Sequence, residues 1–280
     1  MHRNYHFISG LPRSGSTLLS GILRQNPDIY ASMSGPVAGL FETILAQLSA
    51  GNEMSTMVSY EQRKSLLQGL FESYYNDKPN RIVFDTNRSW TAKFSAILTV
   101  FPNAKIICLV RDVAWIMDSF ERLYRQNPFE NTRIFASPQQ RATVYTRLDY
   151  LAGPNSIVGY PWNSLKEACY SEFADRLMLI DYDILVRKPK EILNHVYEFI
   201  DEEAFDHDFD CVDYDAPKFD YQLGIDGLHR VHKTVEPRPR ESVLPPDLIR
   251  RYSSMSFWRH MQDSNAIRLV PTIKNNPIIK

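Results

Sequence analysis

The stretch from Tyr5 to Arg24 constrains the fold of this chain more than any other. It reads YHFISGLPRSGSTLLSGILR, which is a short apolar run, a loop bounded by glycines, and a segment with apolar side chains at helical spacing. The loop has the spacing of a phosphate-binding loop, G-x-x-x-x-G-K-[ST], except that Ser16 stands where the motif has lysine. Glycines let the backbone turn tightly and aim several N–H groups at one point, and the following helix adds the positive end of its dipole. The stretch therefore predicts a strand–loop–helix unit that holds an anion.

The missing lysine indicates what kind of anion the loop holds. A nucleoside triphosphatase uses that lysine to neutralise the β- and γ-phosphates, and the next hydroxyl to hold Mg²⁺. Here the cation is Arg13, inside the loop, and the hydroxyls of Ser16 and Thr17 follow the second glycine. These groups suit a smaller terminal phosphate and require no metal. A turn without a ligand is the alternative, but glycines, arginine and hydroxyls coincide at the carboxyl end of the strand, where open α/β sheets bind ligands.

Two segments resemble one family of enzymes. Residues 11–19, LPRSGSTLL, are similar to the 5′-phosphosulfate loop of sulfotransferases that use 3′-phosphoadenosine 5′-phosphosulfate (PAPS), and most similar to the tyrosylprotein type and its bacterial relatives. Residues 109–119, Leu-Val-Arg-Asp-x₆-Ser, resemble the strand and helix that bind the 3′-phosphate of PAPS in that family. Because both matches occur in the family's order, the chain is identified as a member of the PAPS-dependent sulfotransferases.

The resemblance implies a set of cofactor-binding residues. The loop would contact the 5′ end of the cofactor, while Arg111 and Ser119 would hold its 3′-phosphate through forked donors and a hydroxyl. Tyr182 matches a tyrosine near the nucleotide, and a basic segment at about 227–246 would close over the cofactor. The whole set is Pro12, Arg13, Ser14, Gly15, Ser16, Thr17, Leu18, Arg111, Ser119, Tyr182, Arg230 and Lys233.

The catalytic residues are less defined. Asp85 ends an apolar run, and it could be a magnesium ligand, a helix cap, or an active-site acid or base. In the family the equivalent strand end carries Lys-x-His or Asn-Lys-Asp, whereas this chain has Asp-Thr-Asn-Arg, so we expect a catalytic or substrate-binding role for Asp85 or Arg88. Asp85 is the first candidate for the general base, with His229 or His232 in reserve. The resemblance implies that Arg13 stabilises the charge that grows on the bridging oxygen.

Alternation of apolar runs and helical periodicity predicts the fold. Strands are expected at 81–85, 105–110 and 177–182, and helices at 40–48, 62–75, 91–100, 113–124, 139–151, 168–176, 189–200 and 248–261, with a loop at 29–39. Such alternation predicts an α/β, P-loop-like fold with a central parallel sheet and helices on both faces. A single domain accounts for 280 residues. Residues 128–165, rich in proline and aromatic side chains, read as a variable insertion, either surface packing or a lid over the acceptor.

Composition excludes several classes. The net charge of −1 gives no basic field for nucleic acid or an anionic membrane. The 3 cysteines show neither a disulfide framework nor the spacing of a zinc site. No apolar run is long enough to span a membrane. The N-terminus enters the first strand within about five residues, which leaves no room for a signal peptide. We therefore expect a cytoplasmic protein without a metal.

The acceptor is the open question. Tyrosylprotein sulfotransferases carry a catalytic glutamate shortly after the first helix, where this chain reads ASMSGP, so a small molecule such as a bacterial natural product is favoured over peptide tyrosine. The acidic run at 201–215 is either a solvated loop or a dock for a cationic acceptor. We expect in-line transfer of the sulfuryl group from PAPS to a hydroxyl, amino or guanidino group. A P-loop kinase or NTPase and a non-catalytic nucleotide-binding module are the alternatives.

Overall fold

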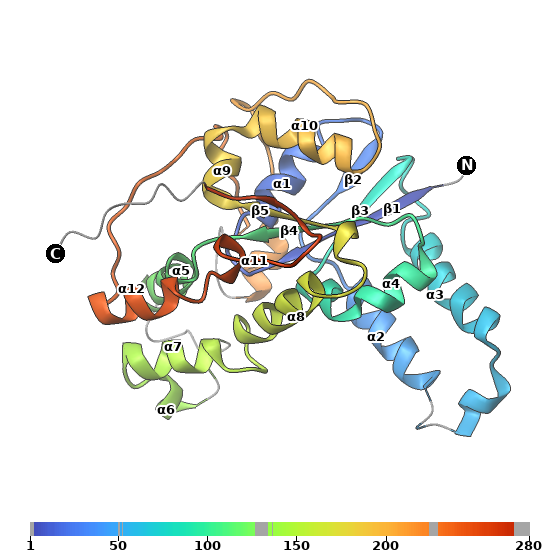
Figure 1. Ribbon diagram of the computed structural model, residues 1–280, viewed down its shortest axis with the longest axis horizontal. Helices are drawn as coiled ribbons and strands as arrows, with labels where there is room; N and C mark the ends of the chain where they lie inside the picture. Colours follow the sequence, from blue (N-terminus) through green and yellow to red (C-terminus); the bar gives the residue numbers. More distant parts are fainter. Residues whose placement is uncertain are drawn as a thin grey trace.

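A six-stranded parallel sheet forms the centre of the protein (Figure 1). The computed structural model describes residues 3–49, 51, 53–126, 134–135, 137–223 and 229–271. Within them the strand order is β2-β3-β1-β4-β5-β6, and every adjacent pair is parallel. The strands are β1 (Asn4–Gly10), β2 (Ile29–Ala31), β3 (Ile82–Thr86), β4 (Ile106–Val110), β5 (Leu177–Asp181) and β6 (Ile267–Leu269). The predicted α/β, P-loop-like fold is confirmed.

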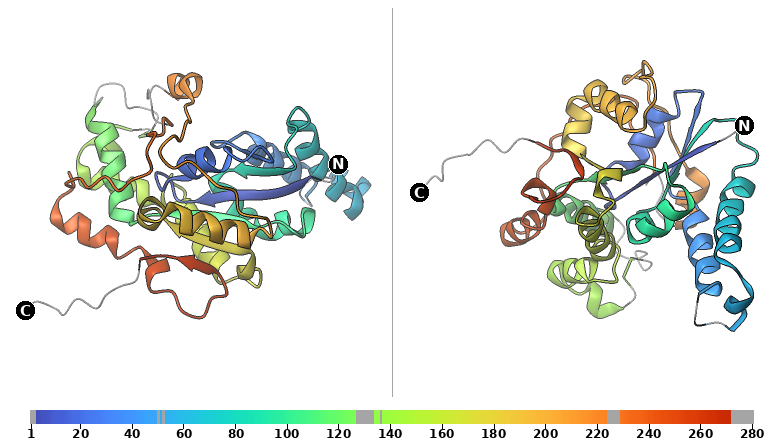
Figure 2. Two further views of the ribbon diagram at one scale, coloured as in Figure 1. Left: turned by 90° about the horizontal axis from the view of Figure 1, so that it is seen from above. Right: turned by 45° about the vertical axis from the view of Figure 1, so that its right-hand side comes forward.

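Helices cover both faces of the sheet (Figures 1 and 2). One face packs against α1 (Ser16–Leu23), α9 (Tyr182–Arg187) and α10 (Pro189–Phe199), whose apolar side chains share a core with those of the strands. The larger core on the other face is built from α2 (Val37–Gln47), α3 (Tyr60–Tyr74), α4 (Phe94–Val100), α5 (Val113–Gln126), α7 (Val144–Ala152), α8 (Gly159–Cys169) and α12 (Pro246–Ser253). The shorter elements are α6 (Pro138–Arg141), α11 (Pro217–Leu223) and the 3₁₀ turns η1 (Glu53–Met57), η2 (Arg88–Lys93), η3 (Ala174–Arg176) and η4 (Phe257–Arg259).

The topology places the phosphate loop at a point where the winding of the sheet reverses. From β1 the chain crosses to β2 and β3 on one side, and from β3 it passes over β1 to β4 on the other. β1 and β4 are direct neighbours, with Gly10 paired to Leu109. The carboxyl ends of adjacent strands diverge at such a point and leave a crevice for ligands. The loop after β1 and the Arg111-Asp112 pair after β4 therefore begin at the same crevice.

Several boundaries differ from the sequence prediction. The expected loop at 29–39 contains the edge strand β2, and β6 was not expected, because three residues are too few to show periodicity. The helix expected at 168–176 is instead α8, at Gly159–Cys169, and Pro161 is accommodated because it lies in the first turn. The expected helix at 139–151 is two helices, since Thr143 begins α7 with a capping box to Thr146.

The ends of three other predicted elements also move. The segment at 91–100 starts as the 3₁₀ turn η2 before α4, and the last helix stops at Ser253 rather than Met261. Tyr182 is the first residue of α9 and not the last of β5, because the Asp181 carboxylate caps that helix by accepting from the Asp183 N–H at 3.0 Å. Of the 128–165 insertion and the 227–246 segment, positions 128–133, 136, 227 and 228 lie outside the described residues.

Candidate active site

The loop after β1 adopts a backbone that requires glycine at two positions. Gly10 has φ 104°, and a Cβ there would lie 2.2 Å from the carbonyl oxygen of Leu109. Gly15 has φ 98°, and a Cβ there would lie 2.7 Å from a ring carbon of Tyr182. Left-handed backbone and lack of space both exclude a larger side chain. The loop therefore lies flat against β4 on one side and against Tyr182 on the other.

Ser14 holds the loop in place. Its side chain is fully buried, and its hydroxyl contacts the carbonyl oxygen of Leu109 at 2.8 Å as well as the carbonyl oxygen of Leu11. The side chain is thus turned toward the sheet and does not line the adjacent cavity. This geometry gives Ser14 a role in fixing the loop to β4, next to the backbone N–H groups of the following residues.

A cavity of about 600 Å³ lies over the carboxyl ends of the strands. It brings together most of the residues predicted to form the site: Pro12, Arg13, Gly15, Ser16, Thr17, Leu18, Arg88, Arg111, Tyr182, His229 and Arg230. Four other predicted residues do not line it: Ser14, Asp85, Ser119 and Lys233. Further lining residues include Tyr150, from the insertion considered as a lid over the acceptor, and residues that the sequence did not single out: Phe120, Leu123, Ile134, Ile157 and Arg238.

Two arginines and their neighbours form a cationic end of this cavity. Arg13 Nε donates to Ser119 Oγ at 3.1 Å, so Ser119 acts on the cavity through Arg13. Burial, together with the charges of Arg111 and Arg240, lowers the pKa of Arg13, which nevertheless remains charged at any physiological pH. The Arg111 guanidinium lies 4.3 Å over the Tyr182 ring, and its buried Nε has no hydrogen-bond partner within the described part of the chain. An oxyanion would satisfy that donor.

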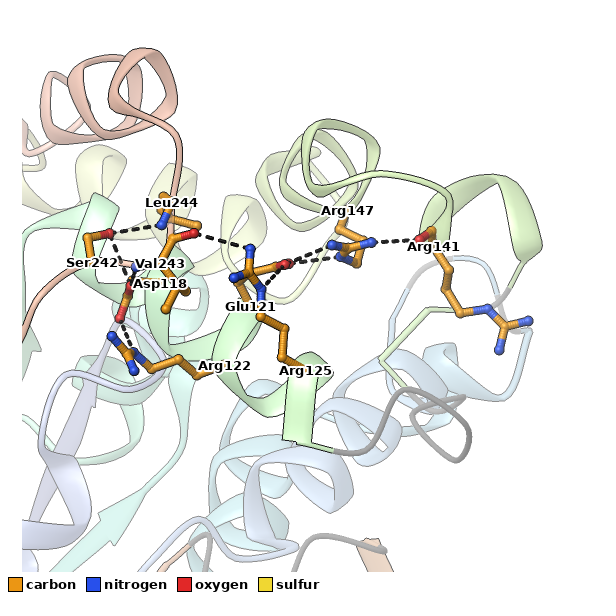
Figure 3. A network of polar contacts seen from close by, with 9 residues as sticks. All are labelled: Asp118, Glu121, Arg122, Arg125, Arg141, Arg147, Ser242, Val243 and Leu244. Atoms are coloured by element: carbon orange, nitrogen blue, oxygen red, sulfur yellow. Dashed lines mark hydrogen bonds and ion pairs between the residues drawn. The ribbon is translucent and has the colours of Figure 1, made fainter.

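A buried carboxylate ties the late basic segment to α5 (Figure 3). Asp118 is fully buried and accepts from the Val243 N–H at 2.7 Å and from the Ser242 hydroxyl at 3.1 Å. Its other oxygen accepts from Arg122 Nε and Arg240 Nη2, both at 2.9 Å. Four donors neutralise the buried charge, as a carboxylate in this position requires. Asp118 thus fixes residues 240–243 to α5, and it is the residue directly before Ser119 in that helix.

A second buried carboxylate ties α7 to the same helix (Figure 3). Both Glu121 oxygens accept from the guanidinium of Arg147 at 2.8 Å, and Arg125 Nε donates to one of them at 2.8 Å. Arg147 belongs to α7, which also carries the cavity residue Tyr150. A bidentate pair of this kind constrains the angle between the helices as well as their distance. The wall of the cavity opposite the phosphate loop is therefore fixed to α5.

A histidine–aspartate pair lies at the cavity. His229 lines the cavity, and its Nδ1 lies 2.6 Å from Oδ1 of Asp220, while its backbone N–H donates to Oδ2 at 2.9 Å. Asp220 is fully buried and belongs to α11. A carboxylate at Nδ1 keeps the proton of a neutral imidazole on that nitrogen, so the ring's basic lone pair is on Nε2. No sequence pattern had indicated Asp220, which is one acid in a polar stretch.

Asp85 occupies a different environment from the one expected of a base. Its Oδ1 accepts from the Trp90 indole N–H at 2.7 Å, and its Oδ2 accepts from the Tyr75 hydroxyl at 2.5 Å. Asp85 lies two residues after Val83 and therefore on the same face of the sheet. Val83 packs in the larger core, whereas α1 packs in the core on the other face. Burial raises the pKa of Asp85 to about 6, although both hydrogen bonds act in the other direction. These contacts favour a structural role for this carboxyl.

The acidic run lies beside the basic segment and away from the cavity. Backbone hydrogen bonds join Val212 N–H to the Lys233 carbonyl at 2.8 Å and Val231 N–H to the Tyr214 carbonyl at 3.0 Å. No residue of 201–215 lines the cavity described above, and neither does the Lys233 side chain, which is exposed. Arg230 does line it and approaches Asp215 at 3.9 Å. The acidic run therefore pairs with the basic segment through its backbone and does not line the cavity.

No helix among the residues that the structure describes is both long enough and apolar enough to cross a membrane. No group of three or more His, Cys, Asp or Glu side chains among them is placed to hold a metal ion.

An α/β fold with a phosphate-type loop after β1 and an arginine after the neighbouring strand β4 places this protein in the P-loop-like class of folds. The family model described as "Sulfotransferase family" matches residues 6–207, and the chain belongs to that family. No curated protein matches it.

Solved structures share the fold at low identity. The sulfotransferase domain from the curacin biosynthetic pathway is 17% identical, with a TM-score of 0.58, over 90% of this chain and 96% of that one. The sulfotransferase domain from the Synechococcus PCC 7002 olefin synthase is 18% identical, with a TM-score of 0.53, over 91% and 95%. These similarities extend over nearly the whole chain, including the part beyond residue 207.

Proposed function

We propose that this protein transfers a sulfuryl group from PAPS to a hydroxyl or amino group of a small-molecule acceptor. The observation that carries the proposal is the pairing of two anion sites on one cavity: the loop around Arg13, and Arg111, whose Nε has no hydrogen-bond partner among the described residues. A cofactor with phosphate at both its 5′ and 3′ positions suits two such sites, whereas the lysine that a nucleoside triphosphatase needs is replaced by Ser16.

The residues present suit this cofactor. The backbone of residues 12–18 would hold the 5′ end, because N–H groups at a helix N-terminus favour an oxyanion. Arg111 would hold the 3′-phosphate, with Arg13 placed between the two sites by its bond to Ser119. Tyr182 packs so closely against Gly15 that a Cβ there would clash with its ring, and this contact keeps the ring beside the loop. Bound PAPS would supply an activated sulfuryl group, with adenosine 3′,5′-bisphosphate (PAP) as the leaving group.

The protein's part in the reaction is charge stabilisation and proton transfer. With PAPS bound, the Arg13 guanidinium and the loop N–H groups would stabilise the negative charge of the leaving group, and would do so more strongly in the transition state than in the ground state. His229 Nε2 accepts the proton of the acceptor, and Asp220 holds the ring and stabilises the imidazolium that forms. We assign the base to His229 rather than Asp85 because His229 lines the cavity.

A small-molecule acceptor is supported by two features of the chain. The segment after α1 has no carboxylate in the position where tyrosylprotein sulfotransferases carry their glutamate. The cavity is of the size that small-ligand sites have in proteins. We propose that this small-molecule acceptor is a natural product.

Calorimetry with PAP, beside ATP with Mg²⁺, tests the cofactor directly. We expect micromolar binding of PAP and none of ATP. ATP binding that depends on Mg²⁺, with no PAP binding, would instead assign the loop to a kinase or NTPase. PAP binding without transfer to any member of a hydroxyl and amine panel would favour a nucleotide-binding module.

A further inference from the structure

We infer that the acceptor carries an oxyanionic group, a carboxylate or a phosphate, which Arg88 binds while the apolar body of the acceptor lies on the opposite wall of the cavity. This inference rests on the proposed function, because it names the acceptor class for the same site. It replaces the cationic acceptor considered from the sequence, for which the acidic run was the only support.

Arg88 is a cation in the cavity that the fold does not use. Its guanidinium makes no hydrogen bond and no ion pair within the described residues, and only its backbone carbonyl accepts a hydrogen bond there, from the Ser9 hydroxyl. Other arginines of the site have partners, such as Ser119 for Arg13 and the Tyr182 ring for Arg111. The Arg88 side chain is exposed to the cavity, and the protein around it lowers its pKa by desolvation. A forked donor in this setting is suited to a carboxylate or phosphate.

Arg88 is separate from the cofactor arginines. The charges of Arg111 and Arg240 act on Arg13, whereas desolvation alone acts on Arg88. Arg88 opens η2, which follows β3 and packs against α8, and the residues just before α8 line the cavity. Arg88 therefore lies after β3, next to the residues that precede α8, whereas Arg111 lies after β4.

An apolar surface accompanies this arginine. Phe120 and Leu123 from α5 line the cavity, together with Ile134, Tyr150 and Ile157 from the described part of the insertion. Burying an aliphatic or aromatic body against such side chains contributes roughly 25 cal/mol per Å² of apolar area. A charged head at Arg88 and an apolar body here define an amphiphile.

The charge of the lining excludes a cationic acceptor. Among its described lining residues the cavity has one carboxylate, Glu236, and this pairs with Arg238 at 3.2 Å. Against it stand the guanidinium groups that line the same cavity, which are those of Arg13, Arg88, Arg111, Arg230 and Arg238. A positively charged group here would meet repulsion from several directions, whereas an anion would be attracted.

Protein saturated with PAP provides the test, because the cofactor site is then filled. Decanoate, decyl phosphate and decan-1-ol share one chain length and differ in the head group, and their affinities are measured by calorimetry. We expect at least one anion to bind about tenfold or more tightly than the alcohol. In Arg88→Gln that preference should vanish, while the affinity for decan-1-ol stays unchanged. Arg250→Gln, at an exposed arginine of α12, is the matched control and should keep the preference.

Each outcome decides the inference. The better anion identifies the head group as carboxylate or phosphate. Equal binding of anions and alcohol by the wild type, binding of no ligand, or a preference that persists in Arg88→Gln would overturn it. Thermal unfolding of Arg88→Gln with and without PAP verifies that the variant is folded and loaded. Failure of the wild type to bind PAP would contradict the proposed function itself, so the two failures are distinguishable.

Discussion

Arg13 Nε donates to Ser119 Oγ at 3.1 Å, which joins the phosphate loop to α5 across 106 residues of sequence. The next residue toward the N-terminus, Asp118, fixes Ser242 and Val243 of the late basic segment. Two successive residues of one helix thus position the loop after β1 and the segment that follows α11. The family's two sequence motifs are therefore in direct contact, and the basic segment is anchored beside them.

Ser119→Ala should weaken PAP binding without unfolding the protein. The substitution removes the hydroxyl that accepts from the Arg13 Nε–H, a loss of about 1 kcal/mol or about fivefold in Kd. Calorimetry measures the affinity, and Ser119→Thr, which keeps the hydroxyl, should retain more of it than Ser119→Ala. Equal affinity of Ser119→Ala and the wild type would show that Arg13 needs no help from α5.

Arg111→Ala should weaken PAP binding more strongly. It removes the donor Nε, which has no hydrogen-bond partner in the described part of the chain, together with the charge over the Tyr182 ring. A charge-assisted hydrogen bond of this type contributes about 2 kcal/mol, or about thirtyfold in Kd. Arg111→Lys keeps the charge but not the forked donors and should bind with intermediate affinity. Unchanged affinity in Arg111→Ala would remove Arg111 from the cofactor site.

Gly15→Ala should damage the loop. A Cβ at φ 98° and 2.7 Å from the Tyr182 ring must either strain the backbone or displace the ring. We expect the free energy of unfolding to fall by about 1–2 kcal/mol, with weaker PAP binding. Gly39→Ala in α2 is the control, since nothing lies within 4 Å of its added Cβ, and it should stabilise the helix by about 1 kcal/mol. Similar effects of the two variants would show that Gly15 has no special backbone role.

The sequence predicted the loop and four of the six strands among the described residues, because each depends on a local pattern. Local patterns cannot show which distant side chains meet. Whether Asp85 faces ligand or core depends on Tyr75 and Trp90, and both contribute through tertiary packing. Asp220 becomes significant only when α11 brings it to His229. The edge strands β2 and β6 are three residues each, and pairing rather than periodicity defines them.

Asp85→Asn should change the pH dependence of stability and leave turnover unaffected. Burial raises the pKa of Asp85 to about 6 in the folded state, so folding favours the neutral carboxyl. That contribution is fully present below the unfolded value near pH 4 and is lost as the pH rises through about 6, a loss of about 3 kcal/mol. Asparagine does not ionise, and it can accept from Trp90 and donate to Tyr75. The variant should therefore be the more stable protein at pH 7.

Urea unfolding of both proteins at pH 4.5 and 7 measures this difference. The quantity compared is the free energy of unfolding of the variant minus that of the wild type. Burial lowers the pKa of His6 and His207 to about 4, so their contribution to stability is lost as the pH falls. This contribution is common to both proteins and cancels in the difference. A fall in turnover of several orders of magnitude, with PAP binding intact, would instead restore Asp85 to the catalytic role that the sequence predicted.

His229→Gln should lower kcat by about 10²–10³ because it removes the group that accepts the acceptor's proton. Asp220→Asn should lower kcat less and leave the KM for PAPS unchanged, since Asp220 only holds and charges the ring. Groups that act as one unit are not additive, so the double variant should be no slower than His229→Gln alone. His232→Gln, at the other histidine of the cavity wall, is the control and should keep most of the activity. Initial rates with the best acceptor of the hydroxyl and amine panel measure all four. Additive losses would separate Asp220 from the chemistry, and a larger loss in His232→Gln than in His229→Gln would move the base to His232.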